Sequence, residues 1–508
     1  MIPFSWQLTT STESRNLDEK TINEFGIPGY TLMEIAGYAM ATDLINTLKR
    51  GQHVLVFCGK GNNGGDGLVI ARYLSEHFHK VTVLFVSGTD GLSPDAKKNY
   101  GLLKKLKQHL DHDQEQAITF IEGWKPEALT SDYDVIIDAM LGTGLDSELR
   151  GYYPEAVKWM NGSSIPAYAV DVPTGLNSDT GDVMGTSVLA DKTFNLGTRK
   201  LGCYLSDGPR VSGDVLHCEL PFPNFLKRSH HRYLIDSSWV DDFAKPDQTK
   251  KARHKYEAGV LYIIAGSEGL TGAALMAARS AWAEGIGAVI LLTPRGILPV
   301  IESQSPQIIK KPIGSSDDVC FKSSHLSELE QILSEKDGVV LMGPGLGRDE
   351  STLTFVQQIV TKISKAMVLD ADALFALSKI GWDWAAKKEH PVILTPHPGE
   401  LKRLVSGKIA PDFERLNTVE EFSQMNGVYT LSKGNPTLFV TPAGTSYLTG
   451  YDTRKFARAG FGDILAGKIG AKLSISYKAI YSGLSGLLSG HKKSEKIVNK
   501  PLEPIDLI

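Results

Sequence analysis

Short apolar runs alternate with amphipathic segments over about residues 50–220, and this alternation predicts a sheet covered by helices. Four runs rich in Val, Ile and Leu occupy residues 54–58, 81–86, 135–139 and 167–170. Such continuous runs are typical of parallel strands that are buried on both faces. Apolar residues at helical spacing over 68–78 lie between the first two runs. The first part of the chain is therefore predicted to be a doubly wound α/β domain.

The same alternation restarts near residue 260. Predicted strands occupy residues 260–265, 289–292, 338–342, 366–369, 392–394, 428–431 and 437–440, and a helix is predicted over 271–283. No sequence repeat relates the two halves, so two different folds are expected. The sequence predicts a second parallel-sheet α/β domain, larger than the first.

A change in composition separates the two halves. Pro221, Pro223 and Pro246 accompany a polar stretch that ends at 247–255, and such a stretch is typical of a linker. The predicted organisation is a domain at 1–220, a linker at 221–250 and a domain at 251–508. The expected fold class is α/β, with two three-layer parallel-sheet domains.

Composition argues against some classes of binding partner and favours one cellular compartment. The net charge of −4 argues against nucleic-acid and membrane-surface partners, which favour a basic excess. The four cysteines include no Cys-x-x-Cys pair, which favours a reducing cytoplasm. The N-terminus lacks the pattern of a signal peptide, and no apolar run approaches the roughly 18 residues that span a bilayer. A soluble cytoplasmic protein is expected.

In the first half, polar residues follow the predicted strands directly. The loop Gly59-Lys60-Gly61-Asn62-Asn63-Gly64-Gly65-Asp66-Gly67 comes after the first strand, and its glycines permit close approach to a ligand. Asp138 and Asp171 end later strands, and Thr174 follows. With Asn62 and Asn63 these residues predict an oxygen-rich site, although each Asp could instead only cap a turn.

In the second half, Ala459-Gly460-Phe461-Gly462-Asp463 opens an apolar helix. Backbone N–H groups at a helix start favour a phosphoryl group, and Asp463 could accept a proton from an attacking hydroxyl. The alternative is that Asp463 is a helix cap. His397 lies between two prolines, where it could equally make a structural hydrogen bond.

The string at 59–67 resembles the NAD(P)H-hydrate epimerase family. The resemblance extends over roughly 10–220 and includes Leu17-Asp18, 32–37, 191–194 and Gly197-x-x-Lys200-x-Gly202. It implies a Rossmann-like domain with Asp171 as acid–base catalyst. It implies substrate contacts at Asn62, Asn63, Gly64, Gly65, Asp66, Gly142, Thr143, Gly144, Leu145, Asp146, Ser147, Glu148 and Asp171. It also implies a potassium ion held by Asn63, Asp138 and Thr174, the last being Ser in most members; oxygen ligands suit such a hard cation.

The second half resembles the ADP/ATP-dependent NAD(P)H-hydrate dehydratase family, which has a ribokinase-like fold. The resemblance covers about 250–490 and rests on His254-Lys255-x-x-x-Gly259, 271–273, Gly343-Pro344-Gly345-Leu346-Gly347, Asp370-Ala371-Asp372-Ala373-Leu374, Thr395-Pro396-His397-Pro398-Gly399-Glu400 and Gly460–Asp463. It implies hydrate contacts at Ala273, Gly345, His397 and Asp463, with Asp463 catalytic. It implies an adenine nucleotide on Lys433, Gly434, Asn435, Pro436, Thr437 and Gly462. The order of the two domains resembles the fused bifunctional repair enzyme of many bacteria, which implies ADP.

This resemblance implies a two-step repair of hydrated nicotinamide nucleotides. The first domain would interconvert the R and S epimers of NADHX or NADPHX, and the second would dehydrate the S form with ADP and Mg²⁺. The products would be NAD(P)H, AMP and phosphate. A homo-oligomer is expected.

The sequence departs from the dehydratase family at two places, and three other functions are alternatives to repair. Phe461 stands where the family has a small residue, and 451–458 lacks the usual Asn-Pro-Gly-Met-Ala-Thr character. A ribokinase-type small-molecule kinase would use the same Asp463. A dehydrogenase is disfavoured, because 81–86 runs into Ser87-Gly88-Thr89-Asp90 without the expected ribose-binding acid. A non-enzymatic binding protein would not need Asp171.

Overall fold

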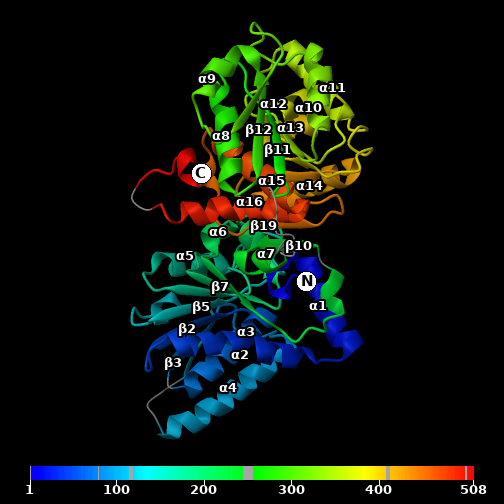
Figure 1. Ribbon diagram of the computed structural model, residues 1–508. Helices are drawn as coiled ribbons and strands as arrows, with labels where there is room; N and C mark the ends of the chain where they lie inside the picture. The colour runs from blue at the N-terminus through cyan, green and yellow to red at the C-terminus, as the bar shows by residue number, and fades with distance from the viewer. Residues whose placement is uncertain are drawn as a thin grey trace. The chain divides into compact units, whose positions relative to one another are not determined.

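The chain forms two compact units, Pro3–Arg232 and Tyr233–Ile508. A computed structural model describes residues 2–77, 79–113, 118–229, 231–243, 256–407, 412–497 and 500–508. Each unit is described by itself (Figure 1).

The boundary between the units, at Arg232 and Tyr233, falls within the expected linker at 221–250. Leu220 and Phe222 are buried in the first unit, where they pack with Leu32. β10 (Arg232–Ile235) forms the edge of the second sheet next to β19 (Ser446–Thr449). Trp239 of α7 (Ser237–Phe243) is also buried and stacks on Tyr447, with 6.0 Å between ring centroids. Buried apolar residues therefore flank Arg232 on both sides, and 244–255, which includes the end of the expected linker, lies outside the described residues.

The first unit contains a seven-stranded sheet of order β4-β3-β2-β5-β6-β7-β9, and every pairing in it is parallel. The strands are β2 (His53–Cys58), β3 (Lys80–Phe85), β4 (Ile118–Glu122), β5 (Val135–Ala139), β6 (Ala167–Val170), β7 (Lys192–Leu196) and β9 (Asp214–Cys218). The strand order reverses between β2 and β5. Ligands of doubly wound sheets bind at such a switch point.

Helices cover both faces of this sheet. The helices of the unit are α1 (Ser11–Glu19), α2 (Gly29–Thr47), α3 (Asn62–Glu76), α4 (Pro94–Asp113), α5 (Tyr153–Gly162) and α6 (Gly208–Val211). Val54, Val56 and Cys58 of β2 face apolar residues of α2, α3 and α4, and α2 and α3 lie side by side (Figure 1). Leu55 and Phe57 of the same strand face α5. Alternate residues of one strand thus support two helical layers.

The second unit contains a ten-stranded sheet of order β10-β19-β18-β17-β16-β15-β14-β11-β12-β13. Its other strands are β11 (Val260–Ile264), β12 (Ala288–Pro294), β13 (Ile309–Ile313), β14 (Val339–Met342), β15 (Met367–Leu369), β16 (Val392–Leu394), β17 (Tyr429–Ser432) and β18 (Leu438–Val440). Strands β11 to β17 pair in parallel. The strand order reverses between β11 and β14.

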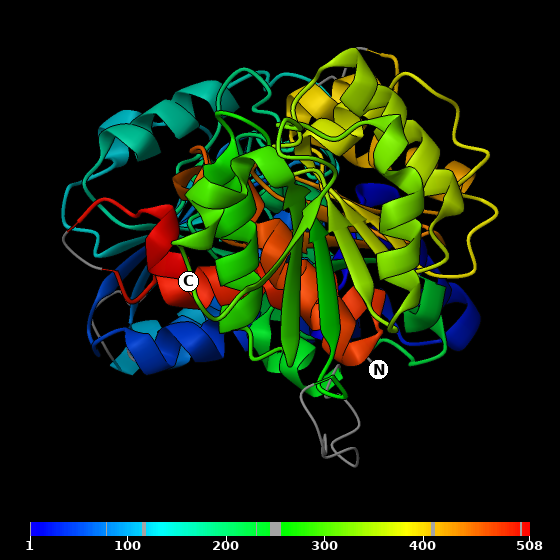
Figure 2. The same ribbon diagram turned by 45° about the horizontal axis from the view of Figure 1, so that its top comes forward.

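Helices again lie on both faces. They are α8 (Thr271–Ala283), α9 (Leu298–Glu302), α10 (Leu326–Ser334), α11 (Glu350–Lys362), α12 (Ala371–Leu377), α13 (Pro398–Leu404), α14 (Asp412–Asn426), α15 (Phe461–Ser476) and α16 (Ala479–Ser494). α15 packs between α8 and α16 on one face (Figures 1 and 2). Buried side chains of α10, α11 and α12 pack on the other face, against alternate residues of β11 such as Tyr262 and Ile264. The predicted fold class, two three-layer α/β domains with parallel sheets, is confirmed.

One strand expected in the parallel set runs the other way. β18 pairs with β17 antiparallel, and β19 pairs with β18 antiparallel. Only residues 433–437 connect β17 to β18, and a connection this short can form a hairpin but not a parallel crossover. The same hairpin presents the predicted nucleotide loop at the end of β17.

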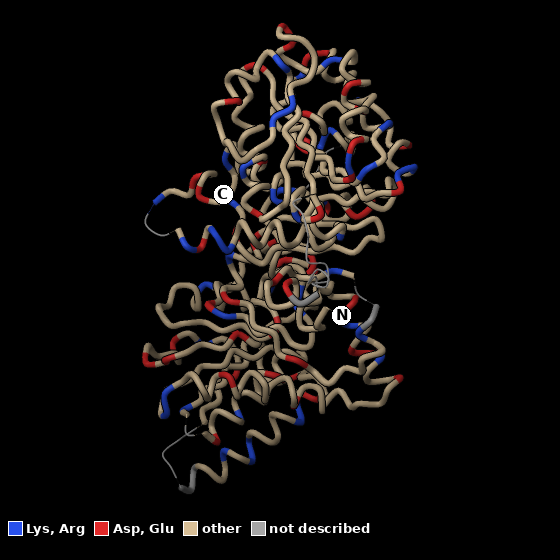
Figure 3. The backbone as a smooth tube through the Cα atoms, viewed as in Figure 1, with Lys and Arg blue, Asp and Glu red and all other residues tan. Residues whose placement is uncertain are grey.

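Charged residues of both signs are interspersed along the backbone of each unit (Figure 3). Among the described residues, no helix has both the length and the apolar character to cross a membrane.

A buried charge cluster joins α8, α15 and α16. The Lys468 ammonium lies 2.5 Å and the Lys472 ammonium 2.8 Å from carboxylate oxygens of Glu284, which also accepts from Ser489 Oγ. Burial alone would raise the pKa of Glu284, but Lys468 and Lys472 outweigh it and lower that pKa to about 2. The ionised carboxylate therefore stabilises the folded unit.

We expect Glu284→Gln to lower the free energy of unfolding by about 3–5 kcal/mol, because it leaves Lys468 buried beside a neutral group. Urea unfolding of the intact chain measures this loss. The contribution of Glu284 should be complete above pH 4.5 and disappear as the pH falls toward 2. As a control, Glu335→Gln breaks the exposed pair with Lys311 and should cost less than about 1 kcal/mol. Equal losses in the two variants would contradict the expectation.

Candidate functional site

The first unit has a cavity of about 530 Å³ at the carboxyl ends of β2, β5 and β6. This position is the switch point of the sheet, where the order of the strands reverses. Its wall comes from α1, α2, the α3 start, the loops after β5 and β6, and β8 (Arg199–Lys200). The polar and charged residues that line it are Ser14, Arg15, Asp18, Asn62, Asn63, Asp66, Asp95, Thr143, Asp171 and Lys200.

Two glycines of the loop after β2 allow the chain to pass the loop after β5. A Cβ on Gly59 would lie 1.9 Å from the carbonyl oxygen of Met140, and a Cβ on Gly64 would lie 2.1 Å from the carbonyl oxygen of Gly59. No side chain fits at either position. These glycines bring the start of α3 next to the β5 loop, which places Asn62 and Asn63 in the cavity wall.

The backbone of Asp171 has an unusual conformation. Its φ of 67° is left-handed, a conformation that is uncommon for a residue other than glycine and that concentrates at functional sites. The Lys200 ammonium lies 2.6 Å from Asp171 Oδ1, which also accepts from the backbone N–H of Leu196 at 3.2 Å. The Asn195 side chain donates to the Asp171 carbonyl. Asp171 Oδ1 is therefore occupied, whereas Oδ2 is directed toward Gly142.

Asp138 is fully buried beside Thr174. The backbone N–H and the hydroxyl of Thr174 both donate to its carboxylate at 2.7 Å, and the N–H of Met140 donates at 3.2 Å. Burial raises the pKa of Asp138 to about 6, against the effect of these hydrogen bonds. Among the described residues, no basic side chain pairs with this carboxylate.

Asn63 completes the set of oxygen atoms. Its Oδ1 lies 3.3 Å from the position of a Cβ on Gly142, and its buried Nδ2 has no hydrogen-bond partner among the described residues. A buried carboxylate that has no basic partner among the described residues and that contacts a hydroxyl group fits a hard cation. Asn63, Asp138 and Thr174 are thus chemically suited to the potassium ion that the sequence implied.

The cavity includes most, but not all, of the predicted first-site residues. Asn62, Asn63, Asp66, Asp171 and residues 142–145 line it. Among the described residues of the wall, Gly64, Gly65, Asp138, Asp146, Ser147, Glu148 and Thr174 are absent. Gly64 and Gly65 are buried within the first turn of α3, whereas Glu148 lies beside Gly185.

Sequence reasoning missed the roles of Lys200 and Asp18, although both stand in strings that resemble the family. Lys200 is only 2% exposed, and a lysine is rarely buried unless it is paired. The sequence does contain a signal for this role. Lys200 and Arg199 are the charged residues within the stretch 194–205, which is otherwise uncharged. Burial raises the pKa of Asp18 to about 6 and raises that of Asp66 well above its usual range.

The second unit has a cavity of about 540 Å³ at the carboxyl ends of β15, β16 and β17 and at the start of α15. Its wall is formed by the β17–β18 hairpin, the residues before α15 and the glycine-rich side of α16. The predicted residues that line it are His397, Lys433, Gly434, Asn435, Thr437, Gly462 and Asp463.

Asp463 lies in the first turn of α15, where backbone N–H groups have no partner within the helix. Burial and the neighbouring Asp370 raise the pKa of Asp463 to about 7, and Lys433 opposes this rise. The Lys433 ammonium lies 2.6 Å from Asp370 Oδ1, which also accepts from Thr395 Oγ1 at 2.8 Å. A Cβ on Gly462 would lie 3.1 Å from the Lys433 ammonium. A proton acceptor, a cation and the backbone N–H groups of Gly462 and Asp463 thus meet at one helix start, whereas the N–H of Phe461 donates to the carbonyl oxygen of Arg458.

His397 caps α13 and also lines the cavity. Its Nδ1 accepts from the N–H of Gly399 at 3.0 Å, and its Nε2 lies 3.2 Å from Glu400 Oε1. The structural hydrogen bond that we considered as an alternative is therefore present. The side chain is nevertheless 52% exposed and available to a ligand.

Three predicted residues, Ala273, Gly345 and Pro436, are not among the described residues of the cavity wall. Ala273 and Gly345 lie next to each other, since a Cβ on Gly345 would be 3.2 Å from that of Ala273. They follow β11 and β14, the strands that flank the switch point of this sheet. Pro436 accepts from Arg415 through its carbonyl oxygen. The first two therefore occupy a ligand-binding position of the fold beside the cavity.

Phe461 directs its ring into a small apolar cluster. The ring is 4% exposed and packs with Ile464, Leu507 and Phe456, whose ring centroid is 5.8 Å away. The substituted stretch before α15 adds cations to the cavity wall, including Arg454, which pairs with Asp452. The bulky ring is thus accommodated by packing, and it does not cover the backbone of Gly462 and Asp463, which line the cavity.

No group of three or more His, Cys, Asp or Glu side chains suited to a metal ion occurs among the described residues. The oxygen set of Asn63, Asp138 and Thr174 is of a different composition. Mg²⁺ often binds through one or two carboxylates together with phosphates of the substrate, and Asp370 and Asp463 are near enough to the helix start to contribute to such a site.

Both halves of the chain match known protein families. Residues 29–202 match the family described as YjeF-related protein N-terminus, and residues 261–502 match the family described as NAD(P)H-hydrate dehydratase.

Complete relatives share this two-part organisation. The bifunctional NAD(P)H-hydrate repair enzyme Nnr of Salinibacter ruber is 33% identical over 491 residues, which cover 94% of this chain and 90% of the relative. The protein of the same name from Thermofilum pendens is 32% identical over 465 residues, covering 91% and 86%. A solved structure of the ADP/ATP-dependent NAD(P)H-hydrate dehydratase from Bacillus subtilis, co-crystallised with ATP/Mg²⁺, is 24% identical. The match covers 53% of this chain and 92% of that one, with a TM-score of 0.44.

Proposed function

Since this chain belongs to the family of bifunctional NAD(P)H-hydrate repair enzymes, we propose that its two cavities act in turn on one hydrated dinucleotide. The first unit interconverts the R and S epimers of NADHX or NADPHX. The second unit dehydrates the S epimer with ADP and releases AMP and phosphate. Both reactions act at the C6 hydroxyl of the same hydrated dinucleotide. This shared substrate explains why one chain carries two different glycine-rich sites.

In the first unit, Asp171 acts as an acid–base catalyst at C6. Its Oδ2, which lies near Gly142, and its position in the cavity wall support this role, and Lys200 fixes the other carboxylate oxygen. Asn63, Asp138 and Thr174 would hold K⁺, which supplies a fixed positive charge for the pyrophosphate or for the polar ring substituents. Asn62, Asp66 and residues 142–145 would bind the dinucleotide, with Gly64, Gly65 and residues 146–148 farther from it.

In the second unit, Asp463 removes the proton from the C6 hydroxyl, and the resulting oxygen attacks the terminal phosphorus of ADP as AMP leaves. The ring nitrogen lone pair then assists departure of phosphate, and loss of a C5 proton restores the dihydropyridine. The N–H groups at the start of α15 and the Lys433 ammonium stabilise the transferring phosphoryl group. The loop 433–437 and Gly462 would hold the nucleotide, while Ala273, Gly345 and His397 would contact the hydrate.

Mg²⁺ would be held by phosphate oxygens of ADP together with Asp370 or Asp463. When bound, it offsets negative charge on the transferring group. The residues fit this role because Asp370 and Asp463 face one helix start and the pKa of Asp463 is raised by burial and by Asp370. A cation there would favour the ionised form of Asp463, which is the form that accepts a proton.

The observation that carries the proposal is the meeting of Asp463, Lys433 and the start of α15 at one cavity. We expect racemic hydrated NADH, given ADP, Mg²⁺ and K⁺, to recover its full absorbance near 340 nm. Omission of ADP should prevent recovery, and ATP in its place should be less effective. A plateau near half would indicate that only the second unit is active. A stable phosphate ester without recovery would instead favour a kinase of the ribokinase type.

Cytoplasmic location and self-association remain predictions from the sequence. The domain boundaries that we now propose are 3–232 for the epimerase unit and 233–508 for the dehydratase unit, in agreement with the division of contacts along the chain.

A further inference from the structure

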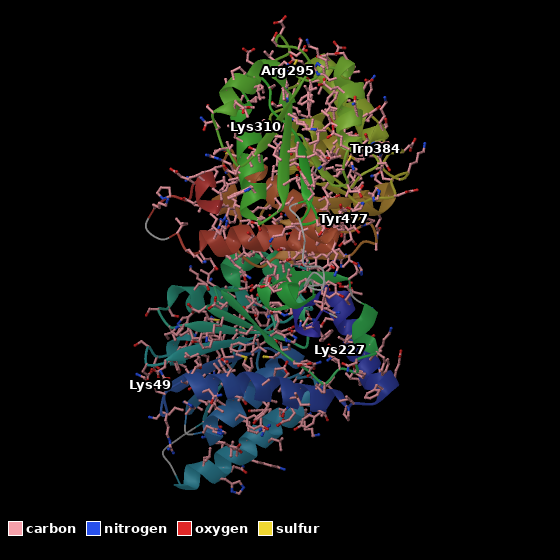
Figure 4. The ribbon with its side chains drawn as sticks, viewed as in Figure 1. Lys49, Lys227, Arg295, Lys310, Trp384 and Tyr477 are labelled. Atoms are coloured by element: carbon pink, nitrogen blue, oxygen red, sulfur yellow. The ribbon has the colours of Figure 1, made fainter. Side chains whose placement is uncertain are left out.

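The N-terminal segment forms one wall of the first cavity. β1 (Leu8–Thr9) pairs in parallel with β8, so that Thr9 lies opposite Lys200. The Gln7 side chain donates to the carbonyl oxygen of Lys227, which is labelled in Figure 4. This segment precedes residue 29, where the match to the first family begins. A part of the site thus comes from outside the matched residues.

The helix α1 that follows β1 is fixed at its start. Thr10 and Glu13 form a capping box, and the Ser11 hydroxyl donates to Asp179 at 2.9 Å. Residues 14, 15 and 18 lie on one face of a helix, and all three line the cavity. The position of Asp18 in the cavity is therefore set by contacts at the helix start and by the strand pair with β8.

Charges around Lys200 are unbalanced. Its ammonium donates to the Leu196 carbonyl oxygen and pairs with Asp171, while Asp18 and Asp66 line the same cavity. Arg15 and Asp95 also line this cavity, so two basic and four acidic side chains share the described wall. Like charges in such a space disfavour one another, and burial raises the pKa values of Asp18 and Asp66.

Among Asp18, Asp66 and Asp171, Asp18 is the best placed to exchange a proton. Asp171 is an ion-paired carboxylate, and Asp66 is only 8% exposed. Asp18 is half-buried, so its carboxyl group can reach both the cavity and solvent. Burial raises its pKa to about 6; Lys200 opposes this, whereas Asp171 and Glu19 add to it. The other charged groups of this wall are Asp66 of α3, Asp95 of α4 and Arg15 of α1.

We propose that Asp18 is a second catalytic residue of the epimerase site, which donates a proton to the departing C6 oxygen while Asp171 serves the entering water. This inference rests on the proposed function of the first unit. A single carboxylate paired with Lys200 would otherwise have to supply and accept protons on both faces of the ring.

Epimerisation then proceeds by loss of water from C6 and its return to the opposite face. Asp18 gives its proton to the C6 hydroxyl, the C6–O bond breaks with the ring nitrogen lone pair forming an iminium, and water leaves. Water then adds to C6 from the other face and loses a proton to Asp171, while the iminium electron pair returns to nitrogen. Exchange of protons with solvent resets both carboxyl groups. In the reverse direction the two residues exchange roles.

The test compares Asp18→Asn with Glu19→Gln, a matched control on the exposed side of the same helix. Proton magnetic resonance follows conversion of the R epimer, and mass spectrometry follows incorporation of ¹⁸O at C6 in labelled water. We expect Asp18→Asn to lower kcat about 100-fold or more in both assays, with KM little changed. Wild-type kcat should fall as the pH rises above about 6, and Asp18→Asn should lack this limb. Glu19→Gln should keep the wild-type kcat and the pH limb, shifted to slightly lower pH because Glu19 adds to the pKa of Asp18.

Further measurements distinguish a catalytic role of Asp18 from misfolding and from failure of the proposed epimerase function. Asp18→Glu should regain part of the rate, and dehydration of the S epimer should proceed at the wild-type rate in every variant, which shows that the second unit is folded. Urea unfolding of the intact chain, compared with the wild type, shows whether the first unit is folded. A wild-type rate and pH profile in Asp18→Asn would overturn the inference, as would a loss of rate with the pH limb intact. If the wild-type chain does not interconvert the epimers at all, the proposed function of the first unit fails, and the inference fails with it.

Discussion

Replacement of Asp463 by Asn should stop dehydration of the S epimer while leaving epimerisation intact. Removal of a general base typically costs a factor of 10²–10⁴, and we expect a loss of kcat of about 10³-fold. The substitution keeps the shape of the side chain, so the first turn of α15 and its N–H groups should be unchanged. Recovery of absorbance near 340 nm from the pure S epimer, with ADP and Mg²⁺ saturating, measures the effect.

The pH profile tests the same residue independently. Asp463 must be ionised to accept a proton, and burial together with Asp370 raises its pKa to about 7. Bound Mg²⁺ favours the ionised form and lowers the midpoint, so the rate of dehydration should rise with pH to a plateau, with its midpoint below about 7, and fall roughly tenfold per unit below that midpoint. Asp452→Asn, which removes an exposed carboxylate paired with Arg454, is the matched control and should keep the wild-type rate. A fully active Asp463→Asn enzyme would refute the assigned role.

Replacement of Asp171 by Asn should abolish epimerisation and leave dehydration active. Racemic substrate should then recover only about half of its absorbance on a short timescale, because the R epimer is no longer converted. We expect the epimerase kcat to fall by about 10³-fold. Asn is the suitable replacement, since it tolerates the left-handed conformation that Asp171 adopts, whereas another side chain would add backbone strain.

Asp146→Asn is the control for this variant. The family resemblance places Asp146 among the substrate contacts, but the residue is not part of the described cavity wall. It should therefore retain nearly the wild-type rate of epimerisation. Complete recovery by Asp171→Asn, or an equal loss in Asp146→Asn, would require a different assignment of the first site.

The central strands could be predicted from the sequence because they are buried on both faces. The runs at 135–139, 167–170 and 392–394 coincide with β5, β6 and β16. β13 was missed, since this edge strand reads Ile-Lys-Lys-Pro-Ile and only its last residue is buried. β9 is likewise an edge strand with a single buried residue. An edge strand needs less apolar sequence, so the pattern on which the prediction relied is weak there.

The aspartates of both sites could be predicted because each follows a strand or starts a helix. Lys200 and Asp18 could not be assigned in this way, because their proximity to Asp171 depends on the pairing of β1 with β8. The antiparallel direction of β18 depended on the short connection from β17, which the apolar pattern alone did not reveal. In both cases a pairing between segments, rather than the pattern within one segment, determined the outcome.

The strand pair of β1 and β8 bears on how this chain should be compared with its relatives. An alignment ranked by overall similarity gives little weight to a short leading segment, and it can shift α1 by a residue without penalty. A shift of one residue would turn Asp18 away from the cavity by about 100°, given 3.6 residues per turn. The capping box at Thr10 and Glu13 and the position of Thr9 opposite Lys200 provide fixed reference points. Relatives aligned on those points can be compared at the position of Asp18, which is proposed to face the nicotinamide ring. The comparison does not depend on how far the rest of the segment has diverged.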